Sequence, residues 1–370
     1  MLSGFGIFIF LYIYLLGIAL YSYTQEDDMK RKRFQTIASA FGLWLVLALR
    51  SPLCGIDLLG EGDDTINYYY VFSEVQNKSF VELLDGEFAS GIGMERSWIL
   101  YNKLVSAFFS SFQFFLALTA LIQIVLISKV IYRLSSHVIL SYMVFFSLGI
   151  YLACFSTLRQ TFALSWTAFA FLFFIEKRYF PFIILVIFAS FFHLSSLIFL
   201  LLLLLKKLKL TFRKGLIALG GLFVIMPFLA VILNFLSLYL FGGNKYSPET
   251  DGGGAVTMFF VYVALFLLSY CIKEESHIVN LLRIVIFMAV AGQSLGYISS
   301  GHLTRIAFYF SLFFMILIPY ILDSIIHPQL RRVSIILCTL LLFAFFYLTS
   351  KDGYLNVVPY SFFWETNTPI

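Results

Sequence analysis

Three arginines in this sequence combine a permanent charge with apolar surroundings. Arg50, Arg159 and Arg305 each stand at the end of a long apolar run, where a charge is costly unless it reaches the interface or binds a partner. The planar guanidinium presents a fork of donors that matches two phosphate oxygens, which a lysine ammonium cannot do. Snorkelling or pairing with a nearby acid would explain any one of them, but the three together predict a phosphate or pyrophosphate site at a membrane edge.

Carboxylates and imidazoles at similar positions are candidates for proton transfer. Asp57 and Glu95 fall in a long polar segment, His193 interrupts an apolar run, and His302 lies beside Arg305. Each could take the proton of an attacking hydroxyl, or orient the group that does so. The adjacent acids at 63 and 64 lack the further ligands of a committed cation site, so we expect neither a metal nor another cofactor.

The composition requires a lipid environment for the elements that carry these groups. Hydrophobic residues make up 61% of the 370 residues and charged residues 12%, with a mean hydropathy of +0.93. Soluble proteins have roughly 45–50% apolar and about 25% charged residues. The net charge of +5 therefore concerns topology and predicts no binding to nucleic acid. The four cysteines form no CxxC pair and predict neither a disulfide framework nor a zinc site.

Eleven apolar runs predict an all-α polytopic membrane protein that forms a single integral membrane domain over residues 1–370. We place these runs at 4–22, 34–49, 104–128, 138–156, 160–175, 179–205, 215–241, 255–272, 278–298, 303–322 and 333–349. Segment 51–103 is polar and acidic, with an amphipathic helix expected near 95–105. Segment 242–254 is a flexible loop rich in glycine, and 350–370 is a tail containing proline and aromatic residues.

Lysine and arginine predict the orientation of these runs. The basic cluster 30–33 places the first connection in the cytoplasm and the N-terminus outside. A single crossing by 179–205 would then leave 11 of the 25 basic residues inside, whereas a re-entrant hairpin with His193 near its turn would leave 17 inside. We therefore predict about ten spans plus this hairpin. Segments 51–103, 242–254 and 350–370, and both termini, are then outside.

Several local patterns, in order along the chain, resemble the EpsG family of Wzy-like polysaccharide polymerases. They are Arg50 with Gly55, Asp57 and the stretch 68–72; Glu95 followed by Asn102, Lys103 and Leu104; Arg159 with Gln160; Phe192, His193 and Ser196; Arg305 with Tyr309 and Pro319; and the closing stretch 359–364. Ser97 stands where the family often has glycine, and Gly62-Asp63-Asp64 offers a second candidate for the Gly-Asp position. The matches extend over most of the chain.

The resemblance implies a GT-C-like polymerase or ligase architecture and a specific reaction. A polymerase of this kind, in the bacterial cell membrane, joins oligosaccharide repeat units carried on undecaprenyl pyrophosphate at the outer face. It transfers the growing chain to the non-reducing end of a new unit without a metal. By this resemblance Arg50, Arg96, Arg159, Gln160, Arg305 and Tyr309 bind the substrate and its pyrophosphate, and Asp57, Glu95, His193 or His302 supplies or orients the base. Implied partners are a flippase and a chain-length regulator.

Three other interpretations stay open from the residues alone. A lipid-linked oligosaccharide flippase or transporter would also have many spans, although such proteins tend to carry internal repeats and midplane sites. An O-antigen-ligase-like transferase, or an acyltransferase built around His193, would use the same residue types. A non-catalytic scaffold in a capsule assembly would tolerate neutral substitutions at the external arginines.

Overall fold

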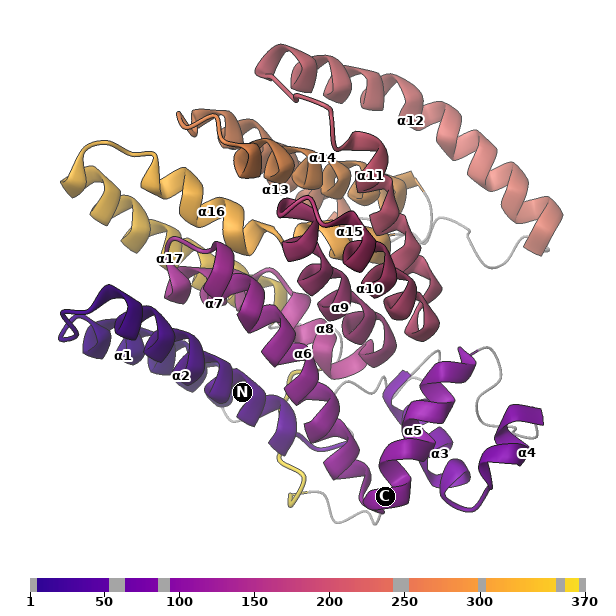
Figure 1. The fold of residues 1–370 in the computed structure, drawn as a ribbon. Coiled ribbons are helices and arrows are strands. Elements are labelled where there is room, and N and C mark those ends of the chain that lie inside the picture. Colours follow the sequence, from indigo (N-terminus) through magenta and orange to yellow (C-terminus); the bar gives the residue numbers. More distant parts are fainter. Residues whose placement is uncertain are drawn as a thin grey trace.

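The computed structural model describes residues 5–52, 64–85, 94–241, 253–298, 304–350 and 357–365, and these are helical almost throughout (Figure 1). The first nine helices are α1 (Gly6–Ser22), α2 (Asp28–Leu49), α3 (Asp64–Gln76), α4 (Phe80–Asp85), α5 (Arg96–Phe108), α6 (Phe112–Leu134), α7 (Val138–Ser147), α8 (Ile150–Ser156) and α9 (Leu158–Ile175). The next five elements are α10 (Tyr179–Phe192), the 3-10 helix η1 (Leu194–Leu201), α11 (Leu202–Leu205), α12 (Phe212–Phe241) and α13 (Gly253–Leu268). The last five are the 3-10 helix η2 (Ser269–Cys271), α14 (His277–Ile298), α15 (Thr304–Ser311), α16 (Phe314–Asp323) and α17 (Pro328–Ser350).

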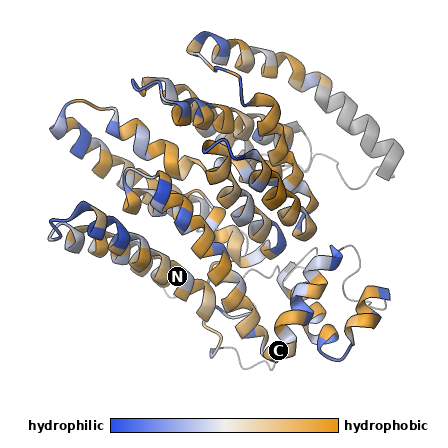
Figure 2. Cartoon of the chain, in the orientation of Figure 1, coloured by the Kyte–Doolittle hydropathy of each residue, from blue (hydrophilic) through white to orange (hydrophobic). Residues whose placement is uncertain are grey.

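Several helices are long and apolar enough to cross a membrane. Within the described residues these are α6, α9, α14 and α17, and two bent pairs, α7 with α8 and α15 with α16, raise the number from 4 to 6. Figure 2 shows apolar residues along the helices and many of the hydrophilic ones at the connections. The chain is therefore an all-helical, multi-pass membrane protein. The expected total of ten spans stays a prediction.

Local chemistry explains where the helices begin and bend. The Asp27 side chain caps α2 by accepting hydrogen bonds from the backbone N–H groups of Met29 and Lys30, at 2.8 and 3.1 Å. Ser111 caps α6 in the same way. Gly149 has a φ of 87°, a left-handed conformation that suits glycine, and the chain bends by 54° there between α7 and α8.

These features correct the boundaries expected from hydropathy. The apolar run 104–128 is not one helix, because α5 ends at Phe108 and α6 starts at Phe112 after its serine cap. The runs 138–156 and 303–322 are each broken into two helices. Hydropathy misses such breaks because the residues that cap or kink a helix contribute little to an average over a window. Residues 104–108 therefore belong to α5, which lies where the amphipathic helix was expected.

Segment 179–205 doubles back on itself at His193. The rings of Phe182 and Phe199 lie 6.1 Å apart between centroids, although 17 positions separate them in the chain. At the two ends of the segment, the Lys206 ammonium lies 4.1 Å from the centroid of the Tyr179 ring. A straight helix would separate such residues by about 25 Å and about 40 Å at 1.5 Å per residue. α10 and η1 are therefore the two arms of a hairpin. Its re-entrant placement in a bilayer stays a prediction.

One end of the bundle, which we name the basic end, contains residues 23–33, 129–138, 176–179, 206–214 and 323–332. Its connections are joined by hydrogen bonds and ion pairs between Lys32 and Ser135 (2.9 Å), Arg133 and Glu176 (2.8 Å), His137 and Asp323 (2.8 Å), and Arg331 and Asp323 (3.8 Å). Because the hairpin returns, Lys206, the first of the basic residues in 206–214, lies next to Tyr179 at this end. The positive-inside rule predicts that the basic end faces the cytoplasm.

The opposite end, which we name the site end, gathers α3, α4, α5 and the segment 357–365 (Figure 1). A cluster of buried aromatic residues fixes α3 and α5 against α6 and α9. Tyr68 and Phe72 of α3 and Trp98 of α5 pack there with Phe115 and Phe162. The segment 357–365 is tied to the end of α2, where Ser51 N–H donates to the Ser361 carbonyl at 2.8 Å. These contacts bring distant parts of the sequence to one end.

Candidate functional site

The carboxylate of Glu95 is the centre of a polar cluster at the site end. Glu95 occupies the N-cap position of α5, and its Oε2 accepts a hydrogen bond from the Arg159 guanidinium. Its Oε1 lies 3.2 Å from Nδ1 of His193 and 3.3 Å from the backbone nitrogen of Leu194. One carboxylate thus joins the starts of α5, α9 and η1, and its partners Arg159 and Leu194 lie 64 and 99 positions after it in the sequence.

The environment of Glu95 decides its charge. Burial acts to raise the pKa of the carboxyl, but the hydrogen bond from His193 and the positive charge of Arg159 outweigh it and lower the pKa to about 2. The group is therefore ionised at neutral pH. A carboxylate with so low a pKa is a poor proton acceptor. Glu95 is therefore better suited to orienting Arg159 and His193 than to removing a proton from the substrate.

His193 stands in the turn of the hairpin, between α10 and η1, with an extended backbone. Because an ionised carboxylate can only accept, Nδ1 donates to Glu95, and in the neutral form of the ring Nε2 then holds the lone pair. Nε2 has no hydrogen-bond partner among the residues that the structure describes. A carboxylate that fixes the tautomer and orientation of an imidazole is the arrangement found in hydrolase triads. His193 is thus prepared to accept a proton at Nε2.

Arg159 lies in the first turn of α9, and its position is fixed from two sides. The guanidinium is paired with Glu95, and its central carbon lies 5.9 Å from the centroid of the Tyr68 ring. The side chain is largely buried. It also stands at the positive end of the helix dipole, where anions are stabilised. A rigid cation at a helix start is suited to a phosphate oxygen.

Gln160 connects the second arginine to this cluster. Its Nε2 donates to the backbone carbonyl of Arg305 at 2.7 Å, so that the first turns of α9 and α15 are adjacent. Arg305 itself is half-buried. One turn further along α15, the buried hydroxyl of Tyr309 accepts a hydrogen bond from Oγ of Ser195 at 3.0 Å. α15 is therefore fastened both to the start of α9 and to the hairpin turn.

Arg50 is fully buried directly after α2 and contacts the residues just before Arg159. Its guanidinium donates to the Phe155 carbonyl and lies 5.2 Å from the centroid of that ring. The Thr65 hydroxyl donates to the same carbonyl at 3.3 Å. On the backbone side, Nε2 of Gln113 donates to the Arg50 carbonyl at 3.0 Å. In these contacts Arg50 joins α2, α8 and α6, and its role toward pyrophosphate stays a prediction.

The remaining predicted site residues are not part of this cluster. Arg96 begins α5 next to Glu95, but its side chain is exposed. Asp57 and His302 lie outside the described residues. Within the described part of the chain, no group of three or more His, Cys, Asp or Glu residues could hold a metal ion. Of the predicted residues, the structure therefore brings together Glu95, Arg159, Gln160, His193, Arg305 and Tyr309, with Arg50 tied to the same end.

Comparison with known proteins identifies the family. The EpsG family matches residues 42–362, which is most of the chain. The chain belongs to the EpsG family. This membership confirms the family that the ordered motifs predict, and it indicates a role in polysaccharide biosynthesis. No match was found among curated proteins or among solved structures. The GT-C-like architecture expected for an EpsG protein therefore stays a prediction.

The sequence did not single out every residue that holds the EpsG site together. Ser195 lies inside the Phe192–Ser196 motif, but only the fold shows that it binds Tyr309. Ser97 donates to the Phe191 carbonyl and so fastens α5 to the end of α10. The signal for Ser195 was its place beside His193 in an otherwise apolar run. Ser97 stood out only as a departure from the family's glycine, and nothing in the sequence indicated its contact with a backbone carbonyl far away in the chain.

Proposed function

We propose that this protein is a Wzy-type polymerase, a glycosyltransferase that joins oligosaccharide repeat units carried on undecaprenyl pyrophosphate into capsular polysaccharide or exopolysaccharide. The observation that carries the proposal is the pairing of one carboxylate with both an arginine and a histidine, Glu95 with Arg159 and His193. It places a phosphate-binding cation and a proton acceptor a few ångströms apart. Transfer from a lipid pyrophosphate needs both groups together.

The reaction follows from these roles. A hydroxyl at the non-reducing end of the new unit attacks the anomeric carbon of the growing chain. The bond between that carbon and the pyrophosphate oxygen breaks, and its electrons leave with the lipid pyrophosphate. The hydroxyl proton passes to Nε2 of His193. Arg159, and Arg305 from the neighbouring helix start, offset the negative charge that grows on the leaving group.

The two ends of the bundle support a site at the outer face of the cell membrane. The hairpin brings Lys206, the first of the basic residues in 206–214, to the basic end and His193 to the site end. We assign the basic end to the cytoplasm by the positive-inside rule. The cluster then faces outside, where a flippase would deliver the repeat units and a chain-length regulator would meet the product. Both chain termini are placed outside on the same reasoning.

The test is elongation by purified protein in lipid vesicles. Its only substrate is a lipid-pyrophosphate-linked repeat unit, without nucleotide sugar. We expect a ladder of longer oligosaccharides with release of undecaprenyl pyrophosphate. Replacing Arg159→Ala should lower the rate about 10²–10³-fold, the usual loss when one group that stabilises a developing anion is removed. Arg331→Ala, at the basic end, is the matched control and should keep the wild-type rate.

The competing interpretations predict different products. Movement of the lipid-linked unit across the vesicle membrane without elongation would identify a flippase. Transfer of a preformed chain to a second lipid without a ladder would identify a ligase. Full-length polymer from Arg159→Ala protein that inserts normally would contradict the assignment of Arg159 to the leaving group.

A further inference from the structure

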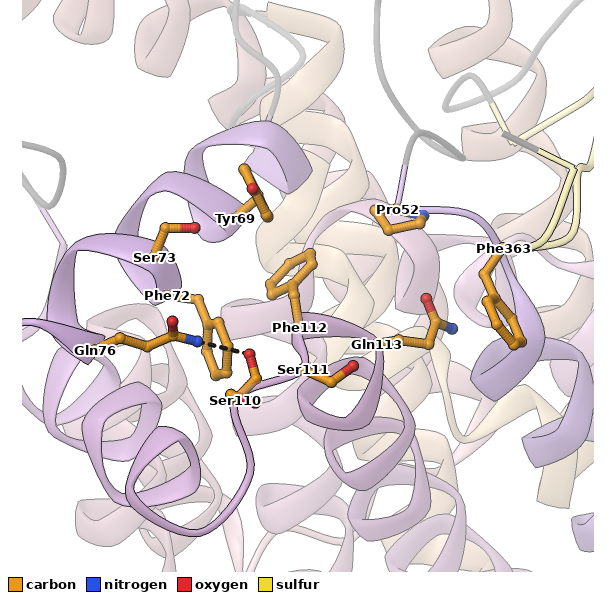
Figure 3. Close-up of a pocket in the computed structure, with 10 residues that line it drawn as sticks. All are labelled: Pro52, Tyr69, Phe72, Ser73, Gln76, Ser110, Ser111, Phe112, Gln113 and Phe363. Atoms are coloured by element: carbon orange, nitrogen blue, oxygen red, sulfur yellow. Dashed lines mark hydrogen bonds between the residues drawn. The ribbon is translucent and has the colours of Figure 1, made fainter. Parts of the chain in front are cut away.

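A small pocket with uncharged walls opens at the site end, apart from the Glu95 cluster. It has a volume of about 260 Å³. Four segments line it: α3, the start of α6 with the two serines before it, and the stretches at 52 and 363, which meet at the end of α2 (Figure 3). Among the described residues that line it, none is charged. The chemistry of this pocket therefore differs from that of the anion site.

Aromatic rings form part of its wall. Tyr69 and Phe112 meet edge to face, with ring centroids 5.4 Å apart, and Figure 3 shows Phe363 on the far side of Gln113. Phe112 is buried, whereas Tyr69 is half-buried and Phe363 is exposed. Two aromatic residues from distant parts of the chain are thus open to a ligand. The face of an aromatic ring stacks well on the C–H face of a sugar ring.

Neutral hydrogen-bonding groups complete the wall. Ser73 contributes a hydroxyl, and Gln76 is held by a 2.7 Å bond from its Nε2 to the Ser110 carbonyl. Nε2 of Gln113 donates to the carbonyls of Ala48 and Arg50. Its Oε1 is buried and accepts no hydrogen bond from any residue that the structure describes. Amides and hydroxyls can donate to and accept from sugar hydroxyls. A buried acceptor such as Oε1 of Gln113 is normally hydrogen-bonded, and a sugar hydroxyl could donate to it.

We propose that this pocket is a saccharide subsite that binds one neutral sugar ring of the oligosaccharide. Its volume lies below the roughly 300–1,000 Å³ of pockets for drug-sized ligands, so it suits one unit of a longer chain. The Gln113 bond to the Arg50 carbonyl ties the pocket wall to the end of α2, which also contacts the residues before Arg159. The inference rests on the proposed function, which supplies the oligosaccharide.

The experiment measures binding of free sugar rather than transfer. The probe is the repeat-unit oligosaccharide released from its lipid by mild acid, titrated against the full-length protein in lipid nanodiscs by saturation-transfer NMR. We expect Tyr69→Ala and Phe363→Ala to weaken its binding about tenfold each, as for the loss of one stacked aromatic. Tyr70→Ala is the matched control, because the neighbouring Tyr70 is exposed and does not line the pocket.

The outcomes separate this inference from the proposed function. Unchanged binding in Tyr69→Ala and Phe363→Ala proteins, with elongation by the wild type intact, would overturn the subsite and leave the polymerase standing. Loss of binding in those two variants and not in Tyr70→Ala would support the subsite. If the wild type binds the saccharide in this way but builds no ladder, the proposed function fails and the subsite survives. Monodisperse elution of each variant confirms that it folds.

Discussion

The two ends of this protein each hold a histidine, a carboxylate and an arginine, yet the two groups differ in setting. At the site end Glu95 pairs with His193 and Arg159, whose side chains are 28% and 16% exposed. At the basic end Asp323 pairs with His137 and Arg331, which are 42% and 38% exposed. The residue types are the same. The site-end group is drier, and its histidine lies in the turn of a hairpin rather than at the start of a regular helix.

This difference shows that residue types alone do not mark a site. The side chains of His137 and Asp323 are 42% and 29% exposed, and an ion pair that water reaches contributes about 0–1 kcal/mol, so this pair chiefly joins α7 to α16. In the drier group each charge acts more strongly on the others. Glu95 also receives the backbone N–H of Leu194, which positions the histidine turn itself. The comparison predicts that the same substitution will have very different effects at the two ends.

The largest difference is expected for histidine. His193→Gln removes the proposed proton acceptor, and we expect the rate of elongation to fall about 10²–10⁴-fold, the contribution typical of a general base. The dependence of the rate on pH should change as well, because a general base acts only in its unprotonated form. His137→Gln should keep both the rate and its pH profile within about twofold, because His137 lies at the basic end, away from the Glu95 cluster. Initial rates with lipid-linked repeat units between pH 5 and 9 measure both.

Two results would break this comparison. Equal losses in the two histidine variants would point to folding rather than chemistry. A His193→Gln protein with a lower rate but an unchanged pH profile would make His193 a positioning residue and move the proton to another group. Asp57 and His302, which the sequence also proposes, would then be the next to test.

The second difference concerns stability and pH. The pKa of Glu95 is lowered from its ordinary value of 4.5 to about 2, so its ionised form stabilises the fold fully above about pH 4.5 and that stability is lost as the pH falls toward 2. At 1.36 kcal/mol per pH unit the shift corresponds to at most about 3 kcal/mol. We expect Glu95→Gln to lower the unfolding temperature at pH 7. The variant should also lose less stability than the wild type between pH 5 and 3.

Thermal unfolding in detergent across that pH range measures both effects. The matched control is Glu26→Gln, whose side chain is exposed in the connection between α1 and α2, and this variant should behave as the wild type. Parallel loss of stability in the wild type and Glu95→Gln between pH 5 and 3 would contradict the pairing of Glu95 with Arg159 and His193.

The sequence predicted much of the inventory of the candidate site but none of its pairings. Arg159, His193 and Arg305 stood out because charged or polar groups interrupt apolar runs, which is costly in a membrane. The bond between Glu95 and His193 spans 98 positions, and no local pattern carries such a distance. Pairing of this kind depends on how helices pack. Burial of Arg50 could not be foreseen for the same reason, since its partner Phe155 lies in an unremarkable apolar stretch.

For the fold as well, the sequence predicted some features and missed others. Apolar runs and the charge count predicted helices throughout and a hairpin turning at His193, and the chain does turn back there. The hairpin was predicted from the number of basic residues on each side of the membrane, which depended on the five that follow residue 205. No local pattern within 179–205 required the turn. The breaks at Ser111 and Gly149 depend on one residue each, a cap and a left-handed glycine, and an average over an apolar run hides both.

The smallest effect is expected for Asp323, the carboxylate at the basic end. Asp323→Asn removes the charge that pairs with both His137 and Arg331. Because water reaches this group more than the Glu95 cluster, the free energy of unfolding should change by about 1 kcal/mol or less. Elongation should stay within about twofold of the wild type. Raising the salt concentration should mask even this small change, because exposed pairs are screened. A loss as large as that of Glu95→Gln would mean that residue type matters more than setting.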